Sequence, residues 1–215
     1  MAHELYRGSS YPHASFPELT EQNFDNARLF ANRTALIQAQ TDVRGGVVAE
    51  VGIALGDFTQ VLLELLEPKT FYAIDVFRMH EWPEHWGRSS DELFGSKTHR
   101  QQYEGRFASL GSRMVIEEGF SPVCLARLAD ASCDLIYVDA GHDYDTVARD
   151  AQISVTKLKR WGVLVFNYYI MYDHMLGQPY GVVQAVNELV ASSEWRVTGF
   201  ALQQHMFCDI SLRRR

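Results

Sequence analysis

The sequence predicts one α/β domain with a mixed, mostly parallel sheet and helices on both faces. Short apolar runs rich in β-branched residues alternate with amphipathic segments, and a glycine-containing loop follows the first of these runs. The last two runs are joined by a short polar link, which requires a C-terminal antiparallel hairpin. At 215 residues the chain is long enough for one such core and too short for two ordinary domains, so 1–215 is treated as a single domain.

Composition and charge narrow the classes of function. The chain is 47% hydrophobic with a net charge of −7, and its only basic cluster is the terminal run 213–215. Phosphate binding needs clustered Lys and Arg, so no nucleic-acid partner is expected, and no apolar run approaches the roughly 20 residues of a membrane helix. The first residues lack the basic and then apolar segments of a secretory signal, which predicts a cytoplasmic protein. Cys124, Cys133 and Cys208 are expected to be free thiols.

The N-terminal part is predicted to be a helical arm spanning 1–44. Residues 1–17 lack periodicity, whereas apolar residues in 18–40 recur at roughly helical spacing and predict one or two helices. Such an arm either lines the substrate pocket or packs on the sheet, and the sequence leaves both open.

The remaining elements alternate in the order expected of an α/β sheet. A strand is predicted from residue 47 to the glycine loop, and further strands over 70–75, 114–119, 134–139, 162–167, 195–202 and 206–212. Helices are predicted over 58–66, 97–110, 123–128, 143–158 and 181–192. The long piece 76–112 follows the end of the second of these strands, so it is expected to lie over the ligand crevice as a cap. Trp82 and Trp86 within it are candidate contacts for a flat or apolar acceptor, with surface packing as the alternative.

The loop after the first strand is the strongest site signal. Gly52 and Gly56 stand where the backbone must turn sharply or come very close to a ligand. Asp75 ends the following strand, a position from which a carboxylate takes both hydroxyls of a ribose. Together they predict an adenosine-bearing cofactor.

The first residue of this loop distinguishes two kinds of cofactor. The sequence motif of dinucleotide-binding domains is G-x-G-x-x-G, whereas this chain has Glu50-x-Gly52-x-x-x-Gly56. A carboxylate at the head of the loop would repel a pyrophosphate and favour a cationic amino acid. The pattern and the C-terminal hairpin resemble the class I S-adenosylmethionine-dependent methyltransferases, with the resemblance covering roughly residues 45–213. That resemblance implies a Rossmann-like, seven-stranded mixed sheet.

The resemblance also implies which residues hold S-adenosylmethionine and its product S-adenosylhomocysteine. The Gly52 to Gly56 backbone would pass under the methionine part, Glu50 would reach its amino group, and Asp75 would take the ribose. The full set of expected cofactor-binding residues is Glu50, Gly52, Ile53, Ala54, Gly56, Phe58, Thr59, Asp75, Val76, Gly119, Phe120, Ser121, Asp139 and Ala140.

Two further stretches are similar to the small-molecule O-methyltransferases, including antibiotic-sugar and catechol-type enzymes. In that branch an Asp ending strand four and acidic or amide residues ending strand five hold magnesium, and a His three residues after the Asp acts as base in some members. Asp139 and His142 match that pair, so both are expected to be catalytic. The end of strand five departs from the pattern with Asn167, Tyr168 and Tyr169, which are expected to contact the acceptor instead. Asp139 and Asn167 would form a poor magnesium site, so a metal is doubtful.

Other chemistry-bearing residues rank lower. Asp173 and His174 also follow strand five and are placed behind His142 as acceptor contacts. His80 and His85 lack a third ligand and are expected to be exposed loop histidines.

The leading prediction is therefore methyl transfer to a hydroxyl of a small metabolite. The alternatives are a nicotinamide-dependent oxidoreductase and a cofactor-binding protein without catalysis. The expected partner is a small-molecule acceptor, with neither membrane nor nucleic acid, and a homodimer is left open.

Overall fold

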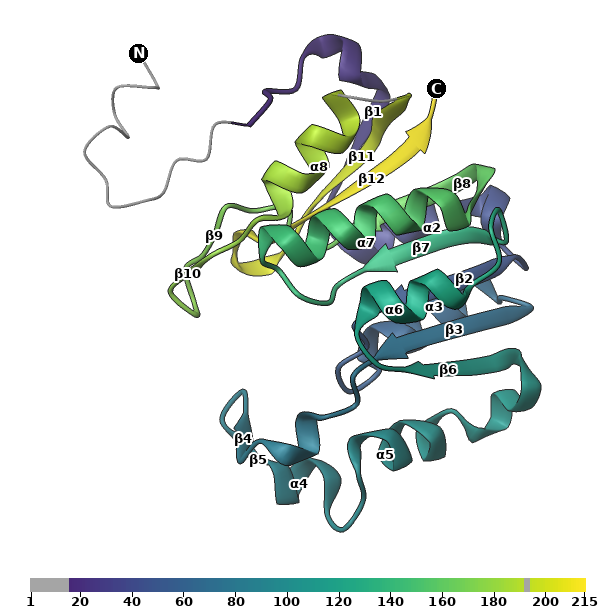
Figure 1. Ribbon diagram of the computed structural model, residues 1–215, viewed down its shortest axis with the longest axis vertical. Coiled ribbons are helices and arrows are strands. Elements are labelled where there is room, and N and C mark those ends of the chain that lie inside the picture. Colours follow the sequence, from purple (N-terminus) through teal and green to yellow (C-terminus); the bar gives the residue numbers. More distant parts are fainter. Residues whose placement is uncertain (1–15, 192–193) are drawn as a thin grey trace.

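The centre of the structure is an eight-stranded sheet with the strand order β1-β11-β12-β8-β7-β2-β3-β6. The structure is a computed structural model that describes residues 16–191 and 194–215. Figure 1 shows the strands side by side from β1 at one end to β6 at the other. Only β12 runs against its neighbours, because it is antiparallel to both β8 and β11. The mixed sheet with a C-terminal antiparallel hairpin, predicted from the sequence, is confirmed.

The apolar runs form the expected strands. The bounds are β2 Val47–Val51, β3 Thr70–Asp75, β6 Met114–Glu118, β7 Cys133–Val138, β8 Leu158–Phe166, β11 Trp195–Leu202 and β12 Cys208–Arg214. In register, Val51 of β2 lies between Ile74 of β3 and Val138 of β7. These parallel strands therefore end at one edge of the sheet, where the residues that follow them meet.

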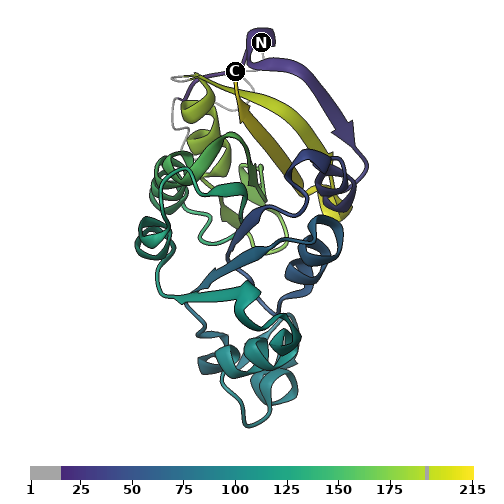
Figure 2. The same ribbon diagram turned by 90° about the vertical axis from the view of Figure 1, so that its right-hand side faces the viewer.

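Helices cover both faces of the sheet, as Figure 2 shows from the side. On one face lie α6 Ser121–Arg127, α7 Tyr144–Lys157 and α8 Val182–Ala191, and on the other lie α2 Arg33–Gln38 and α3 Asp57–Leu66. Alternation along β2 places Ala49 and Val51 in the first core, while Val48 faces the second. Glu50 consequently points toward α3.

A helix precedes β2, as predicted, but the prediction that the whole of 18–40 is helical before the first strand is wrong. Residues Phe24–Phe30 form strand β1, which pairs in parallel with β11, and helix α2 begins only at Arg33. The exposed edge of β11 offers unpaired backbone groups, and pairing with them outweighs a weak helical periodicity in this segment. Strand β1 gives the sheet eight strands instead of seven. The irregular arm predicted over 1–17 lies almost entirely outside the described residues.

The segment 76–112 is more structured than the sequence predicted. It contains the two-stranded hairpin β4 Glu84–His85 and β5 Arg88–Ser89, helix α4 Ser90–Phe94 and helix α5 His99–Arg106. The single helix predicted over 97–110 ends early, and a 3-10 segment follows over Ala108–Arg113. Figure 1 shows this segment beyond β6, at the end of the molecule farthest from β1.

Helix α5 supports the glycine loop from outside. The Nε2 of His99 lies 2.6 Å from the carbonyl oxygen of Ala54, and Arg106 donates to the carbonyl oxygen of Leu55 at 2.7 Å. Tyr103 and Phe107 are buried in the core beside α3. Helix α5 therefore fixes the glycine loop, and the part of the segment that precedes α5 is free to face a ligand.

A second small hairpin follows β8. It consists of β9 Tyr172–Asp173 and β10 Gln178–Pro179, and Figure 1 shows it on the side to which the β7 arrowhead points. Among the helices of the described residues, none has the length and apolar character needed to span a membrane.

Candidate active site

The loop between β2 and α3 is pressed against the end of β7. Gly52 has a φ of +84°, and a Cβ built on it would lie 2.1 Å from the carbonyl oxygen of Asp139. Only glycine allows this approach and this backbone conformation together. The amide of Gly52 also donates to the carbonyl oxygen of Ile74 at 2.8 Å, so the loop is joined to β3 on its other side.

Asp75 joins the end of β3 to the same loop. One of its carboxylate oxygens accepts the amide of Ile53 at 3.0 Å, and the other accepts the amide of Phe77 at 2.7 Å. Its side chain is half-buried at the carboxyl edge of the sheet. Asp75 thus lies where the sequence predicted a ribose-binding carboxylate, and its orientation is fixed by two backbone donors.

A cavity of about 700 Å³ opens beside Asp75. Its lining comes from the ends of β3 and β6 and from the 76–112 segment: Val76, Arg78, Trp82, Glu118, Gly119 and Phe120. The side chains of Trp82 and Phe120 are 63% and 73% exposed, so two large aromatic faces border an open space. Val76, Gly119 and Phe120 were predicted to bind the cofactor. Trp82 was predicted to contact the acceptor, yet it lines this same cavity, whereas Trp86 does not.

Several predicted cofactor residues lie behind the loop instead of facing the cavity. Phe58, Thr59 and Ile53 are buried, and Ala140 packs against the core on the α6–α8 face. The hydroxyl of Ser121 donates to Asp150 at 2.7 Å, inside the contact between α6 and α7. These residues shape the site without presenting side chains to it.

Glu50 is buried behind the loop, on the α3 side of β2. Its side chain accepts a hydrogen bond from Thr59, and the hydroxyl of Tyr103 donates to Thr59 at 3.1 Å. Burial raises the pKa of the Glu50 carboxyl well above its usual range. A carboxyl that resists ionisation repels a phosphate only weakly, so the electrostatic reason for the predicted cofactor preference loses force. The position of Glu50 at the head of the loop remains as predicted.

Asp139, at the end of β7, is the centre of a second group of polar side chains. Its Oδ1 lies 3.5 Å from Nε2 of His142, and its Oδ2 accepts the amide of Asn167 at 2.7 Å. Nη1 of Arg33 lies 3.8 Å from the same Oδ2. The structure therefore brings together the predicted pair Asp139 and His142 and adds a cation that the sequence did not indicate.

Two tyrosines hold the imidazole of His142. The ring stacks on Tyr180 with centroids 4.5 Å apart and an interplanar angle of 17°, and it meets Tyr168 edge-on at 4.7 Å. Within the described part of the chain, Nε2 of His142 is buried and has no hydrogen-bond partner. This nitrogen therefore faces Asp139 across 3.5 Å without a hydrogen bond to it.

The end of β8 does not fit a magnesium ion. The Asn167 amide nitrogen faces Asp139, and its oxygen accepts the amide of Tyr168 at 2.8 Å and Nε2 of Gln203 at 3.3 Å. No group of three His, Cys, Asp or Glu side chains suited to a metal occurs in residues 16–191 and 194–215. The one amide oxygen that magnesium would use is already taken up by donors.

The two tyrosines after Asn167 have different roles. Tyr168 adopts a φ of +52°, and burial raises the pKa of its hydroxyl to about 12. It lies against His142, on the predicted acceptor side. Tyr169 instead donates to Asn187 of α8 at 2.6 Å, which makes it part of the packing between the strand end and that helix.

Sequence reasoning missed a buried chain of polar residues behind Asp139. Arg33 donates to the hydroxyl of Tyr137 at 3.4 Å, and this hydroxyl donates to Asp209 of β12 at 2.6 Å. The side-chain amide of Gln203 donates to both Asp209 and Asn167. The one available signal was Asp209 itself, a carboxylate between the apolar residues Cys208 and Ile210.

The lower-ranked candidates lie elsewhere or act structurally. Asp173 is buried and accepts the amides of Met175 and Leu176 and the hydroxyl of Tyr180, so it shapes the β9–β10 hairpin. His174 is exposed. His85 bonds through Nε2 to the carbonyl oxygen of Met79 at 2.7 Å.

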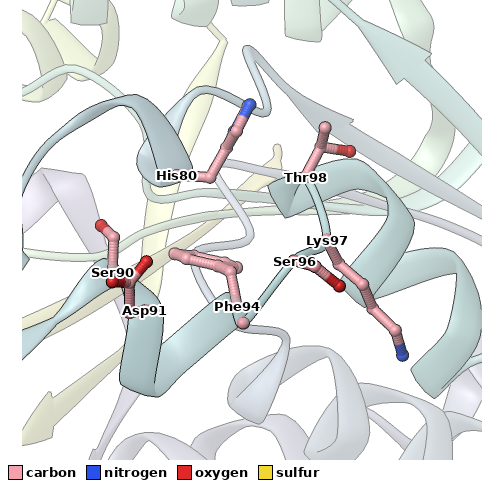
Figure 3. A pocket seen from close by; sticks show the side chains of 8 residues that line it. His80, Ser90, Asp91, Phe94, Ser96, Lys97 and Thr98 are labelled. Carbon is pink, nitrogen blue, oxygen red and sulfur yellow. The ribbon is translucent and has the colours of Figure 1, made fainter.

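A smaller cavity of about 230 Å³ lies within the 76–112 segment (Figure 3). Its lining is His80, Ser90, Asp91, Phe94, Gly95, Ser96, Lys97 and Thr98. Figure 3 shows the Lys97 side chain extending away from His80. None of the residues expected to be catalytic or to bind cofactor or acceptor lines it.

The buried carboxyl of Asp209 predicts a pH-dependent stability. Burial raises its pKa to about 7, so the unfolded chain releases this proton before the folded chain does. The free energy of unfolding should therefore fall as pH rises from about 4 to 7, by at most about 4 kcal/mol from this group. Asp209→Asn should flatten that decline in urea unfolding measured at pH 5, 6, 7 and 8.

Asp42→Asn is the matched control. Hydrogen bonding and charge from Arg213 hold the pKa of Asp42 below its usual range despite partial burial, so Asp42 does not titrate between pH 5 and 8. In this variant the free energy of unfolding should decline with pH as steeply as in the wild type. If the free energy of unfolding declined with pH equally in the wild type and in Asp209→Asn, Asp209 would not be its cause.

One family model matches the central part of the chain. Residues 49–169, more than half of the chain, match the family model described as a methyltransferase domain. A search of curated protein sequences gave no significant match.

Solved structures share the fold at low sequence identity. An rRNA methylase from Streptococcus thermophilus superposes with a TM-score of 0.57 at 14% identity, over 85% of this chain and 93% of that one. A Streptococcus mutans protein described as a methyltransferase, solved in complex with S-adenosylhomocysteine, gives 0.57 at 12% identity over 84% and 96%. A ribosomal protein L11 methylase from Lactobacillus delbrueckii subsp. bulgaricus gives 0.54 at 17% identity over 85% and 76%.

The family match covers the glycine loop, Asp75, the residues lining the cavity beside it and the members Asp139, His142 and Asn167 of the second group, and it contradicts the predicted alternative of a nicotinamide-dependent oxidoreductase. The chain belongs to the methyltransferase domain family of S-adenosylmethionine-dependent enzymes.

Proposed function

We propose that this methyltransferase transfers a methyl group to a hydroxyl of a small metabolite, with His142 as the base. One observation carries the proposal: Gly52 of the cofactor loop touches the backbone of Asp139, whose side chain faces His142. A donor held by the loop would therefore lie next to the imidazole of His142, which faces Asp139.

The residues of the cavity and loop fit S-adenosylmethionine. The flat, apolar lining from Trp82 and Phe120 suits an adenine, and the fixed carboxylate of Asp75 suits ribose hydroxyls. The close approach at Gly52 holds the loop against the end of β7, where the amino-acid part of the cofactor would bind. When bound, the cofactor supplies an electrophilic methyl group, and its sulfur keeps the electron pair of the broken bond.

The chain's own residues then have two tasks, which are to hold the acceptor and to remove its proton. His142 accepts the proton of the acceptor hydroxyl on the ring nitrogen that does not face Asp139, while the oxygen bonds to the methyl carbon. Asp139, 3.5 Å away, stabilises the imidazolium that forms. Stacking on Tyr180 fixes the ring orientation. No step uses magnesium, because the end of β8 does not fit it.

The surroundings of His142 favour a small organic acceptor over RNA. Exposed apolar side chains border this side of the molecule on the β9–β10 hairpin and on the β11–β12 link: Met171, Met175, Leu176 and Met206. An RNA-binding face would present clustered Lys and Arg there. The net charge of −7 favours the same choice.

A methyl-transfer assay with labelled S-adenosylmethionine tests the proposal. The acceptors are hydroxylated aromatic compounds, sugars and polyketides, with total rRNA and ribosomal protein as comparison substrates and EDTA present throughout. Labelled methyl ethers from the small molecules support the proposal. Labelling of RNA or protein alone would overturn it, and tight cofactor binding without any transfer would favour a non-catalytic binding protein.

Trp82→Ala is expected to weaken S-adenosylhomocysteine binding about tenfold. Stacking of an aromatic side chain on a base contributes about 1–3 kcal/mol, and Trp82 is the large ring that the 76–112 segment contributes to the cavity. Isothermal titration calorimetry measures the change in Kd.

Trp86→Ala is the matched control for this prediction. Trp86 is 72% exposed, lies on the same segment and does not line the cavity. Its variant should bind S-adenosylhomocysteine as the wild type does. Equal losses in both variants would show that the segment acts as a whole and that Trp82 does not stack on the adenine.

A further inference from the structure

The guanidinium of Arg33 is a cation on the acceptor side of the site, next to Asp139. Arg33 is the first residue of α2, and its guanidinium carbon lies 4.0 Å from the centroid of the Phe58 ring. The side chain is 32% exposed, so it is packed on one side and open on the other. A cation at the first position of a helix opposes the helix dipole. Helix stability therefore does not explain its placement.

The contacts of Arg33 use only part of its guanidinium. Nη1 donates to Tyr137 at 3.4 Å and lies 3.8 Å from Oδ2 of Asp139. Within residues 16–191 and 194–215, Nη2 and Nε of Arg33 make no hydrogen bond or ion pair. A guanidinium has five N–H donors in a planar fork, so a face that suits a bidentate oxygen ligand remains unused.

The nearby carboxyl groups leave much of the Arg33 charge uncompensated. Burial raises the pKa of Glu50 well above its usual range and that of Asp209 to about 7, so both resist ionisation. Asp139 is the remaining carboxylate beside the guanidinium, and it also faces His142. When His142 accepts a proton, the same carboxylate also has to balance the positive charge of the imidazolium.

We propose that Arg33 binds the methyl acceptor through an anionic oxygen, so that the enzyme prefers acceptors with a carboxylate or an ionised hydroxyl next to the methylated position. The proposal rests on the function proposed above and names the substrate class for that site. Asp139 bridges Arg33 on Oδ2 and His142 on Oδ1, which places the cation and the base on two sides of one carboxylate. The end of β8, with Asn167 and Tyr168, does not suit a metal ion. Arg33 would therefore supply the positive charge that binds the acceptor.

Binding of a matched pair of probes to the S-adenosylhomocysteine complex tests this. Salicylate carries a carboxylate beside a hydroxyl on a flat ring, and salicyl alcohol replaces that carboxylate with a neutral group. In calorimetric titrations the wild type should bind salicylate at least about tenfold more tightly, as expected for a charged hydrogen bond. Arg33→Gln should lose the preference, and Arg33→Lys should keep part of it.

Arg28→Gln is the control, because Arg28 also lies over a phenylalanine ring, at 4.9 Å from Phe30, and is exposed on β1. It should keep the full preference. A wild type without the preference, or an Arg33→Gln variant that retains it, would overturn the proposal. S-adenosylhomocysteine affinity is measured for every variant, so a folding defect is recognised separately. A preference lost only in Arg33→Gln supports the role of Arg33 even if no hydroxyl is methylated, an outcome that would count against the proposed function alone.

Discussion

Gly52→Ala is expected to abolish stabilisation of the protein by S-adenosylhomocysteine. The added methyl group would lie 2.1 Å from the carbonyl oxygen of Asp139, and neither backbone can move without separating the loop from β7. The loop amide that donates to Ile74 would be displaced as well. Thermal unfolding with and without S-adenosylhomocysteine measures the lost shift, and urea unfolding measures the accompanying loss of stability.

Gly45→Ala separates the clash from backbone strain. Gly45 has a similar φ of +72°, but nothing lies within 4 Å of a Cβ built there. Its variant should lose only the roughly 1–2 kcal/mol that a left-handed conformation costs an L-residue, and it should keep the full ligand shift. If Gly52→Ala retained that shift, the loop contact would not position the donor.

The geometry of the glycine loop and of Asp75 was predictable because its signals are local. Gly52 and Gly56 follow β2 and Asp75 ends β3, two strands whose apolar runs are plain in the sequence, and parallel strands bring such ends together at one edge. What the sequence could not give was the burial of side chains. Glu50 looked like a charged ligand contact, yet alternation along β2 turns it toward Thr59.

The acceptor half was only partly predictable because it depends on pairing between distant segments. Asp139 and His142 are three residues apart and were found as a pair. Arg33 reaches Asp139 only because β1 pairs with β11 and α2 follows it, and helical spacing had concealed that strand. Asp209 lies beside Tyr137, 72 residues away, through the β12–β8–β7 order. Such contacts are set by sheet topology, which no local motif records.

His142→Phe is expected to reduce kcat by about 10²- to 10⁴-fold while leaving S-adenosylhomocysteine binding unchanged. Phenylalanine keeps a ring that stacks on Tyr180 and meets Tyr168, so the packing that fixes this loop survives and only the proton acceptor is lost. The measurement is steady-state methyl transfer to the best acceptor of the panel, together with calorimetric binding of S-adenosylhomocysteine.

Two further variants decide whether His142 acts as base or as packing. His142→Ala leaves space for a small base, so added imidazole should restore part of its kcat, because the acceptor proton again has somewhere to go. His205→Asn removes an exposed imidazole from the β11–β12 link and should leave kcat unchanged. Asparagine also tolerates the φ of +62° at that position. Wild-type kcat in His142→Phe would exclude proton transfer by this side chain, and Asp139, held between His142 and Arg33, would then be the remaining group able to accept the proton.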